Sequence, residues 1–85
     1  LVDRVLPADE VQAAAVEWAR QFSGAAALAV RAAKECIDNG LETDLATGLE
    51  IERQQFAGVF ATEDAAAGMK SFVENGPGKA TFSAR

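Results

Sequence analysis

The sequence has few side chains of the kinds that carry out acid–base or covalent chemistry. Histidine is absent from its 85 residues, which excludes His-based triads, zinc sites of the usual kind and Glu-x-x-His di-iron sites within them. Glu50 and Glu52 are two carboxylates, but residues two apart on a helix point in different directions. Cys36 has no histidine to activate it and is expected to be a small buried side chain. We therefore predict no catalytic residue and no metal site.

Charge and length restrict the classes of partner and the size of the fold. The net charge of −5 disfavours nucleic acid or an anionic membrane as the main partner, because both bind a concentrated basic face. No apolar run approaches the roughly 20 residues that span a bilayer. The single cysteine cannot form an internal disulfide, so a cytoplasmic location is expected. With 85 residues and a first residue that is Leu1, the chain is expected to be part of a longer protein.

The spacing of apolar residues predicts two helices in the first half of the chain. Asp9 and Gln12 stand at the spacing of a capping box, so the first helix is expected over 9–23, with Gly24 ending it. A second helix should end at Asn39-Gly40 and pair charges four residues apart on its wet side. Its apolar stripe is expected to contain Ala26, Val30, Ala33 and Ile37.

Two further helices are expected in the second half. Thr43 or Asp44 can cap a third helix, with Gly48 weakening it. Thr62 can cap a fourth helix, which should end at Asn75-Gly76-Pro77. The expected stripes are Leu45, Leu49, Phe56 and Phe60 on the third helix, where Glu52 intrudes, and Ala65, Met69 and Phe72 on the fourth.

These patterns together predict an all-α fold of three to four amphipathic helices. The 19 alanines allow close helix packing but each buries little area, so a core that is stable alone is not expected. Residues 78–85 are expected to form a mobile tail, with Phe82 as a possible anchor.

The run Phe60-Ala-Thr-Glu-Asp-Ala-Ala-Ala-Gly-Met-Lys-Ser-Phe-Val-Glu74 resembles the closing segment of the enoyl-CoA hydratase/isomerase (crotonase) family. Three other stretches resemble the family in the same order. Leu1 to Pro7 is similar to its last short core strand, Arg31 to Ile37 to its Ala-Lys helix, and Leu49 to Phe56 to its Leu-Glu helix. Four such stretches in order and spacing make the resemblance specific.

The resemblance implies a fold and an activity for the whole protein. The parent fold would be an α/β spiral of ββα turns followed by a helical trimerisation region, and this chain would be that region. Residues 1–7 would end the core strand of a catalytic domain, 8–76 would form the helical oligomerisation region, and 77–85 the tail. The activity would be hydration of trans-2-enoyl-CoA in fatty-acid β-oxidation, with coenzyme A thioester as substrate and no separate cofactor. The family's oxyanion-hole amides and catalytic glutamates would lie upstream.

The resemblance also implies four substrate-binding positions. Phe56 would line the acyl channel, with ordinary core packing as the alternative of equal weight. Phe72 would reach across a subunit boundary toward the coenzyme A of a neighbour. Asn75 stands where the family has a phosphate-binding lysine, so Lys70 or Lys79 would have to substitute for it. The Gly76-Pro77-Gly78 insert replaces the usual basic tail.

Two other interpretations remain open at this point. The chain could be a free-standing helical oligomerisation module without catalytic activity, which predicts a stable oligomer with no affinity for coenzyme A. It could also belong to another crotonase-family enzyme, such as an enoyl-CoA isomerase. The hydratase interpretation expects an acyl-CoA substrate, an upstream catalytic domain and a homotrimer or dimer of trimers as partners. It also predicts exposed apolar faces on the first three helices, to match the missing core.

Overall fold

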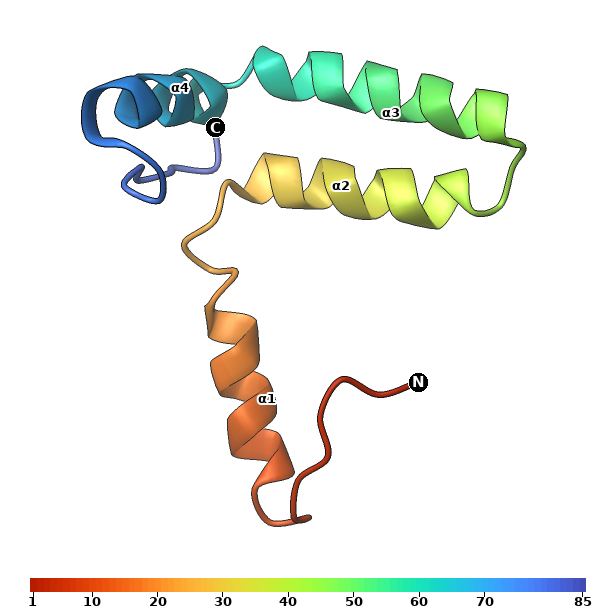
Figure 1. Cartoon of the computed structure of the whole chain (residues 1–85), viewed down its shortest axis with the longest axis vertical. Helices are drawn as coiled ribbons and strands as arrows, with labels where there is room; N and C mark the ends of the chain where they lie inside the picture. Colours follow the sequence, from red (N-terminus) through yellow and green to blue (C-terminus); the bar gives the residue numbers. More distant parts are fainter.

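The computed structural model describes all residues, 1–85, and contains four α-helices and no strand. This confirms the prediction of an all-α chain. Figure 1 shows α2 and α3 lying side by side, α1 pointing away from them, and α4 at the far end of the pair. The helices are α1 (Val11–Arg20), α2 (Ala27–Gly40), α3 (Leu45–Phe60) and α4 (Glu63–Asn75).

A close approach of two glycines joins α2 to α3. Gly40 ends α2 and Gly48 lies in the first turn of α3, and a Cβ built on Gly48 would be 3.4 Å from the Gly40 carbonyl oxygen. The absence of a side chain at Gly48 therefore lets the two helix backbones meet directly after a four-residue turn. The weakness that Gly48 brings to an isolated helix is thus offset by packing.

The face of α3 that packs on α2 is not the predicted stripe. Its less exposed positions are Gly48, Ile51, Gln55 and Val59, which recur at helical spacing. The predicted stripe lies beside this face and stays exposed, with Leu45 at 78% and Phe56 at 64% exposure. The helix therefore has two adjacent apolar faces, of which only one is covered within the chain.

Local capping explains where α3 and α4 begin. The Asp44 carboxylate accepts a hydrogen bond from Thr47 N at 3.0 Å, which selects Asp44 over Thr43 as the cap. Thr62 Oγ1 accepts from Ala65 N at 3.1 Å. Each side chain satisfies a backbone donor that the helix itself leaves without a partner.

The prediction of a capping box at the start of the first helix is wrong. The α1 helix begins at Val11 after Glu10, with no side-chain cap. Glu10 N donates to Pro7 O at 3.0 Å, which closes a turn and places Asp9 before the cap position. At its other end α1 stops at Arg20 and continues as turns, where Ser23 Oγ donates to Arg20 O at 2.7 Å. The helix is therefore shorter than the predicted 9–23.

The last ten residues also differ from the expected mobile tail. They turn back along α4, and both Ser83 N and Ala84 N donate to the Asp64 carboxylate, at 2.7 and 2.9 Å. Phe82 is half-buried against Gly68, whose Cβ, if it had one, would lie 3.4 Å from the ring. The expectation that Phe82 anchors this segment is confirmed. The long-range bonds to Asp64 are the reason that the segment has a defined path.

The chain as a whole is open rather than compact. Its radius of gyration is 16.2 Å, whereas a compact domain of this length has about 12 Å. Its accessible surface is 6977 Å², about 2,200 Å² more than a compact monomer of its mass exposes. Only Ala32 and Asp64 are buried. The four helices therefore do not enclose a core of their own.

Candidate substrate-contacting surfaces

An apolar groove runs between α2 and α3 and contains Phe56. Its volume is about 500 Å³, and seven of its nine lining residues are hydrophobic. The Phe56 ring lies 4.9 Å from that of Phe60, one turn further along the helix. An apolar groove with an aromatic wall suits a hydrocarbon ligand or an apolar protein surface. The lining residues are Ala29, Ala32, Ala33, Cys36, Ile37, Glu52, Gln55, Phe56 and Val59.

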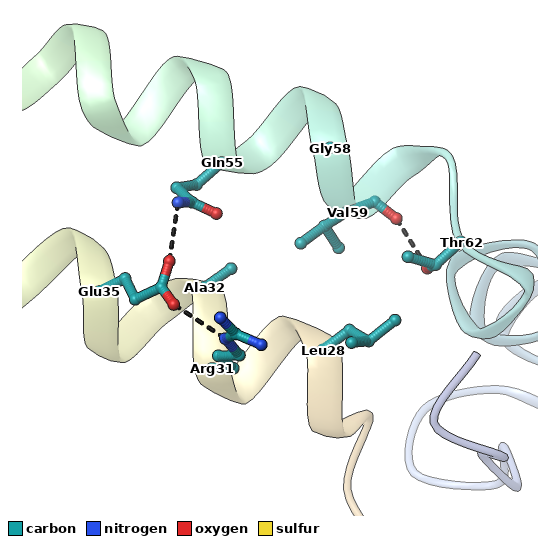
Figure 2. A pocket seen from close by; sticks show the side chains of 8 residues that line it. All are labelled: Leu28, Arg31, Ala32, Glu35, Gln55, Gly58, Val59 and Thr62. Atoms are coloured by element: carbon teal, nitrogen blue, oxygen red, sulfur yellow. Dashed lines mark hydrogen bonds and ion pairs between the residues drawn. The ribbon is translucent and has the colours of Figure 1, made fainter.

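A polar bridge connects α2 to α3 on the other side of Ala32. Figure 2 shows Glu35 between Arg31 and Gln55. Arg31 Nε donates to Glu35 Oε1 at 2.8 Å and Gln55 Nε2 donates to Oε2 at 2.9 Å. The hydrogen bond and the charge of Arg31 lower the pKa of Glu35, with a further contribution from Gln55. This bridge borders a pocket of about 260 Å³ that Leu28, Val59 and Thr62 complete.

A second groove of about 420 Å³ contains Phe72. Three separate parts of the chain line it: the connection from α1 to α2, helix α4, and the segment after α4. Phe72 is 62% exposed, so its ring is available to a ligand or to another protein surface. The lining residues are Gln21, Gly24, Ala25, Gly68, Ser71, Phe72, Gly76, Gly78, Ala80 and Phe82.

The predicted substrate-binding residues do not meet at one place. Phe56 and Phe72 line different grooves, and neither groove includes Lys70 or Asn75. Lys70 is exposed and forms no ion pair, while Asn75 is the last residue of α4. Lys79 is likewise exposed and without an ion pair. Any site that joins these residues would need groups from outside this chain.

The structure also places Glu50 and Glu52, for which the sequence predicts no catalytic role. Glu50 pairs with Arg53 at 3.0 Å on the surface, whereas Glu52 lines the apolar groove. Cys36 is half-buried rather than fully buried, because it lines that same groove. The pairs Arg31–Glu35 and Lys34–Asp38, expected on the wet side of the second helix, form at 2.8 and 2.9 Å.

Sequence reasoning missed two interactions between distant parts of the chain. The bond from Gln55 to Glu35 joins residues 20 apart, and those from Ser83 and Ala84 to Asp64 join residues 19 and 20 apart. Asp64 and Glu63 are both acids in the first turn of α4, where either one complements the helix dipole, so local sequence does not distinguish the residue that binds the C-terminal segment.

Comparison with known proteins defines the class to which these helices belong. The family model "Enoyl-CoA hydratase/isomerase" matches residues 1–83. A probable enoyl-CoA hydratase of Mycobacterium bovis is 43% identical over 74 residues, which are 87% of this chain and 29% of that protein. A probable mitochondrial enoyl-CoA hydratase of Arabidopsis thaliana is 36% identical over 74 residues, 87% of this chain and 25% of that protein.

A solved structure agrees with the sequence comparison. The chain superposes on an enoyl-CoA hydratase from Geobacillus kaustophilus with a TM-score of 0.89 and 30% identity, covering 99% of this chain and 31% of that one. The chain therefore belongs to the enoyl-CoA hydratase/isomerase family. It spans less than a third of the length of the relatives that it matches. The open arrangement of its helices is that of part of a crotonase fold.

None of the four helices combines the length and apolarity that crossing a membrane requires.

Proposed function

We propose that this chain is the C-terminal helical segment of an enoyl-CoA hydratase, which adds water to the double bond of a trans-2-enoyl-CoA thioester. The segment supplies subunit contacts and part of the acyl-CoA pocket. Two backbone amides that polarise the thioester carbonyl and two glutamates that handle the protons of water belong to an upstream catalytic domain. Identity of 43% to a probable enoyl-CoA hydratase supports this activity.

The observation that carries the proposal is the surplus of apolar surface. Trp18 and Phe22 on and after α1 are 53% and 46% exposed, although their rings pack together at 5.0 Å. Isolated apolar residues at a surface are common, but continuous apolar faces mark an interface. The total accessible surface exceeds that of a compact monomer by about 2,200 Å², which is within the range that one subunit contributes to large obligate interfaces. The upstream domain and neighbouring subunits of a homotrimer or dimer of trimers would cover it.

The pocket contribution is assigned to Phe56 and Phe72. The Phe56 groove has the apolar lining that an acyl chain requires. Phe72 presents an exposed ring that can pack against the adenine or ribose of coenzyme A bound to a neighbour. Lys70 and Lys79 are exposed lysines that could supply positive charge for coenzyme A phosphates, and Asn75 offers only an uncharged amide. The free cysteine is compatible with the reducing conditions of the cytoplasm.

A chimeric enzyme tests this proposal. The stretch of the M. bovis relative that matches 74 residues of this chain is replaced by the residues of this chain, and hydration of crotonyl-CoA is measured. The chimera is expected to assemble and to hydrate crotonyl-CoA, whereas the relative with that stretch deleted is expected to be inactive. A chimera that folds but neither assembles nor hydrates the substrate would contradict the proposal.

The free-standing oligomerisation module is the second candidate, and one observation favours it. Asn75 stands at the position where a phosphate-binding lysine is expected, and Gly76-Pro77-Gly78 follows it in place of basic residues. That candidate predicts that the 85-residue chain alone forms a stable helical oligomer and shows no binding to coenzyme A by calorimetry. The hydratase proposal predicts instead that the chain alone lacks a defined oligomeric state.

A further inference from the structure

We infer that Asp64 is a positioning residue that fastens residues 76–85, here called the strap, and that the groove beside Phe72 exists only while the strap is fastened. The inference concerns the origin of this groove, which the proposed function uses but does not explain. It does not depend on the identity of the ligand or on hydratase activity.

The contacts of Asp64 form a reciprocal clamp. Its Oδ1 accepts from Ser83 N at 2.7 Å and from Ser83 Oγ at 3.3 Å, and its Oδ2 accepts from Ala84 N at 2.9 Å. In return, Asp64 N donates to Arg85 O at 2.9 Å. The strap thus satisfies a free amide of the first turn of α4, while the carboxylate satisfies two successive amides of the strap.

Because the Asp64 carboxylate is buried, it needs hydrogen bonds in place of water. Asp64 is 3% exposed, the lowest value among the charged residues. A buried carboxylate is tolerated when hydrogen bonds replace its water. All the hydrogen bonds that the Asp64 carboxylate accepts come from the strap. Releasing the strap would therefore expose the carboxylate and leave the strap amides to water.

Three residues with positive φ allow the strap to turn back along α4. Gly76 and Gly78 have φ of +81° and +71°, and Ala84 has φ of +62°. Glycine adopts this region without steric cost, whereas Ala84 does not. Ala84 is held in that conformation beside the Asp64 carboxylate, to which its own amide donates.

The groove beside Phe72 depends on the strap for one of its walls. Gly76, Gly78, Ala80 and Phe82 come from the strap, and the remaining lining residues come from α4 and from the connection after α1. The only hydrogen bonds that join the end of the strap to α4 are those of Asp64. Phe82 then lies against Gly68, where a larger residue would meet its ring. Asp64 acts on the groove through Phe82 and the strap backbone, not by contact with a ligand.

Hydrogen exchange of the chimeric enzyme described above, followed by mass spectrometry of peptides from α4 and from the strap, tests the inference. Asp64→Asn keeps the shape of the side chain but removes one acceptor, so strap amides are expected to exchange about tenfold faster. Glu63→Gln is the matched control, because Glu63 carries the same charge in the same turn but is exposed and forms no side-chain hydrogen bond to the strap. It should leave strap exchange unchanged, and α4 peptides should stay protected in both variants.

A second variant reaches the strap by another route. Gly76→Ala strains the turn at φ +81° without altering Asp64, and it should also raise strap exchange and speed tryptic cleavage after Lys79. Equal protection of the strap in Asp64→Asn and the unsubstituted chimera would overturn the inference. Strap amides that exchange at the rate of an unstructured peptide in the unsubstituted chimera would overturn it as well. Loss of protection in α4 along with the strap would assign Asp64 to general stability and would also overturn it.

Discussion

The Phe56 side chain lines an apolar groove and is itself exposed to solvent. In the chimera, Phe56→Ala is expected to raise KM for a long-chain enoyl-CoA about tenfold, since the lost aromatic wall forfeits roughly 1.5 kcal/mol of apolar contact. The value for crotonyl-CoA should change little, because its short acyl group does not extend along the groove. Val73→Ala is the control, as Val73 is exposed and lines neither groove. Equal KM values for Phe56→Ala and the parent chimera with long substrates would contradict the assignment.

The hydrogen bonds of Glu35 are expected to make the stability of the α2–α3 pairing depend on pH. Because the Arg31 hydrogen bond and charge lower the pKa of Glu35, its ionised form stabilises the folded chain. That contribution is fully present above the unfolded pKa of about 4.3 and is lost as the pH falls through the lower folded pKa. The effect should be small, since the pair is solvent-exposed.

The measurement for Glu35 is the thermal midpoint of the chimera as a function of pH. Glu35→Gln should remove part of the decline below about pH 4.3. Glu42→Gln is the matched control, because Glu42 is an exposed acid in the turn between α2 and α3 without an ion pair. An identical acid profile in Glu35→Gln and the parent would show that the polar bridge does not stabilise the pairing.

Among the elements, the α2–α3 hairpin has a close approach at Gly48, where a Cβ would already lie 3.4 Å from the Gly40 carbonyl oxygen. Gly48→Leu is expected to lower the free energy of unfolding by about 2 kcal/mol, because the added side chain would meet the Gly40 backbone. Gly58→Ala is the control on the same helix. A Cβ there meets nothing within 4 Å, so it should stabilise by about 1 kcal/mol through helix propensity. Urea unfolding of the chimera measures both, and equal signs for the two variants would contradict the close approach.

The elements also show which features are predictable from sequence. The caps at Asp44 and Thr62 and the pair of Arg31 with Glu35 depend on residues three or four apart, so local spacing was sufficient. The packed face of α3 was not predictable, because this helix has two adjacent apolar faces and only the position of α2 selects between them. The strap was missed for a similar reason, since Asp64 finds its partners about 20 residues away.

The candidate site shows the same division. Phe56 and Phe72 could be singled out from a resemblance in their local motifs, but their distribution over two grooves follows from how the helices are placed. Under the proposed function, each groove would form a site together with groups that lie outside this chain. Such groups leave no pattern in these 85 residues.

For the whole molecule, the open arrangement predicts how the chain behaves alone. With large apolar residues exposed on every helix, the isolated chain is expected to bind a hydrophobic dye and to sediment as a broad range of aggregates. The chimera should bind little dye, because the remainder of the enzyme covers those faces. A monodisperse isolated chain without dye binding would favour the free-standing module.

The intact mass of the natural protein that carries this sequence tests the central claim most directly. If these helices complete an enoyl-CoA hydratase, the mass should be several times the 8.9 kDa of the 85 residues, in keeping with the lengths of the relatives. The same material should hydrate crotonyl-CoA. A mass of 8.9 kDa for a folded, stable protein would contradict the claim, because the helices would then have no catalytic domain to complete.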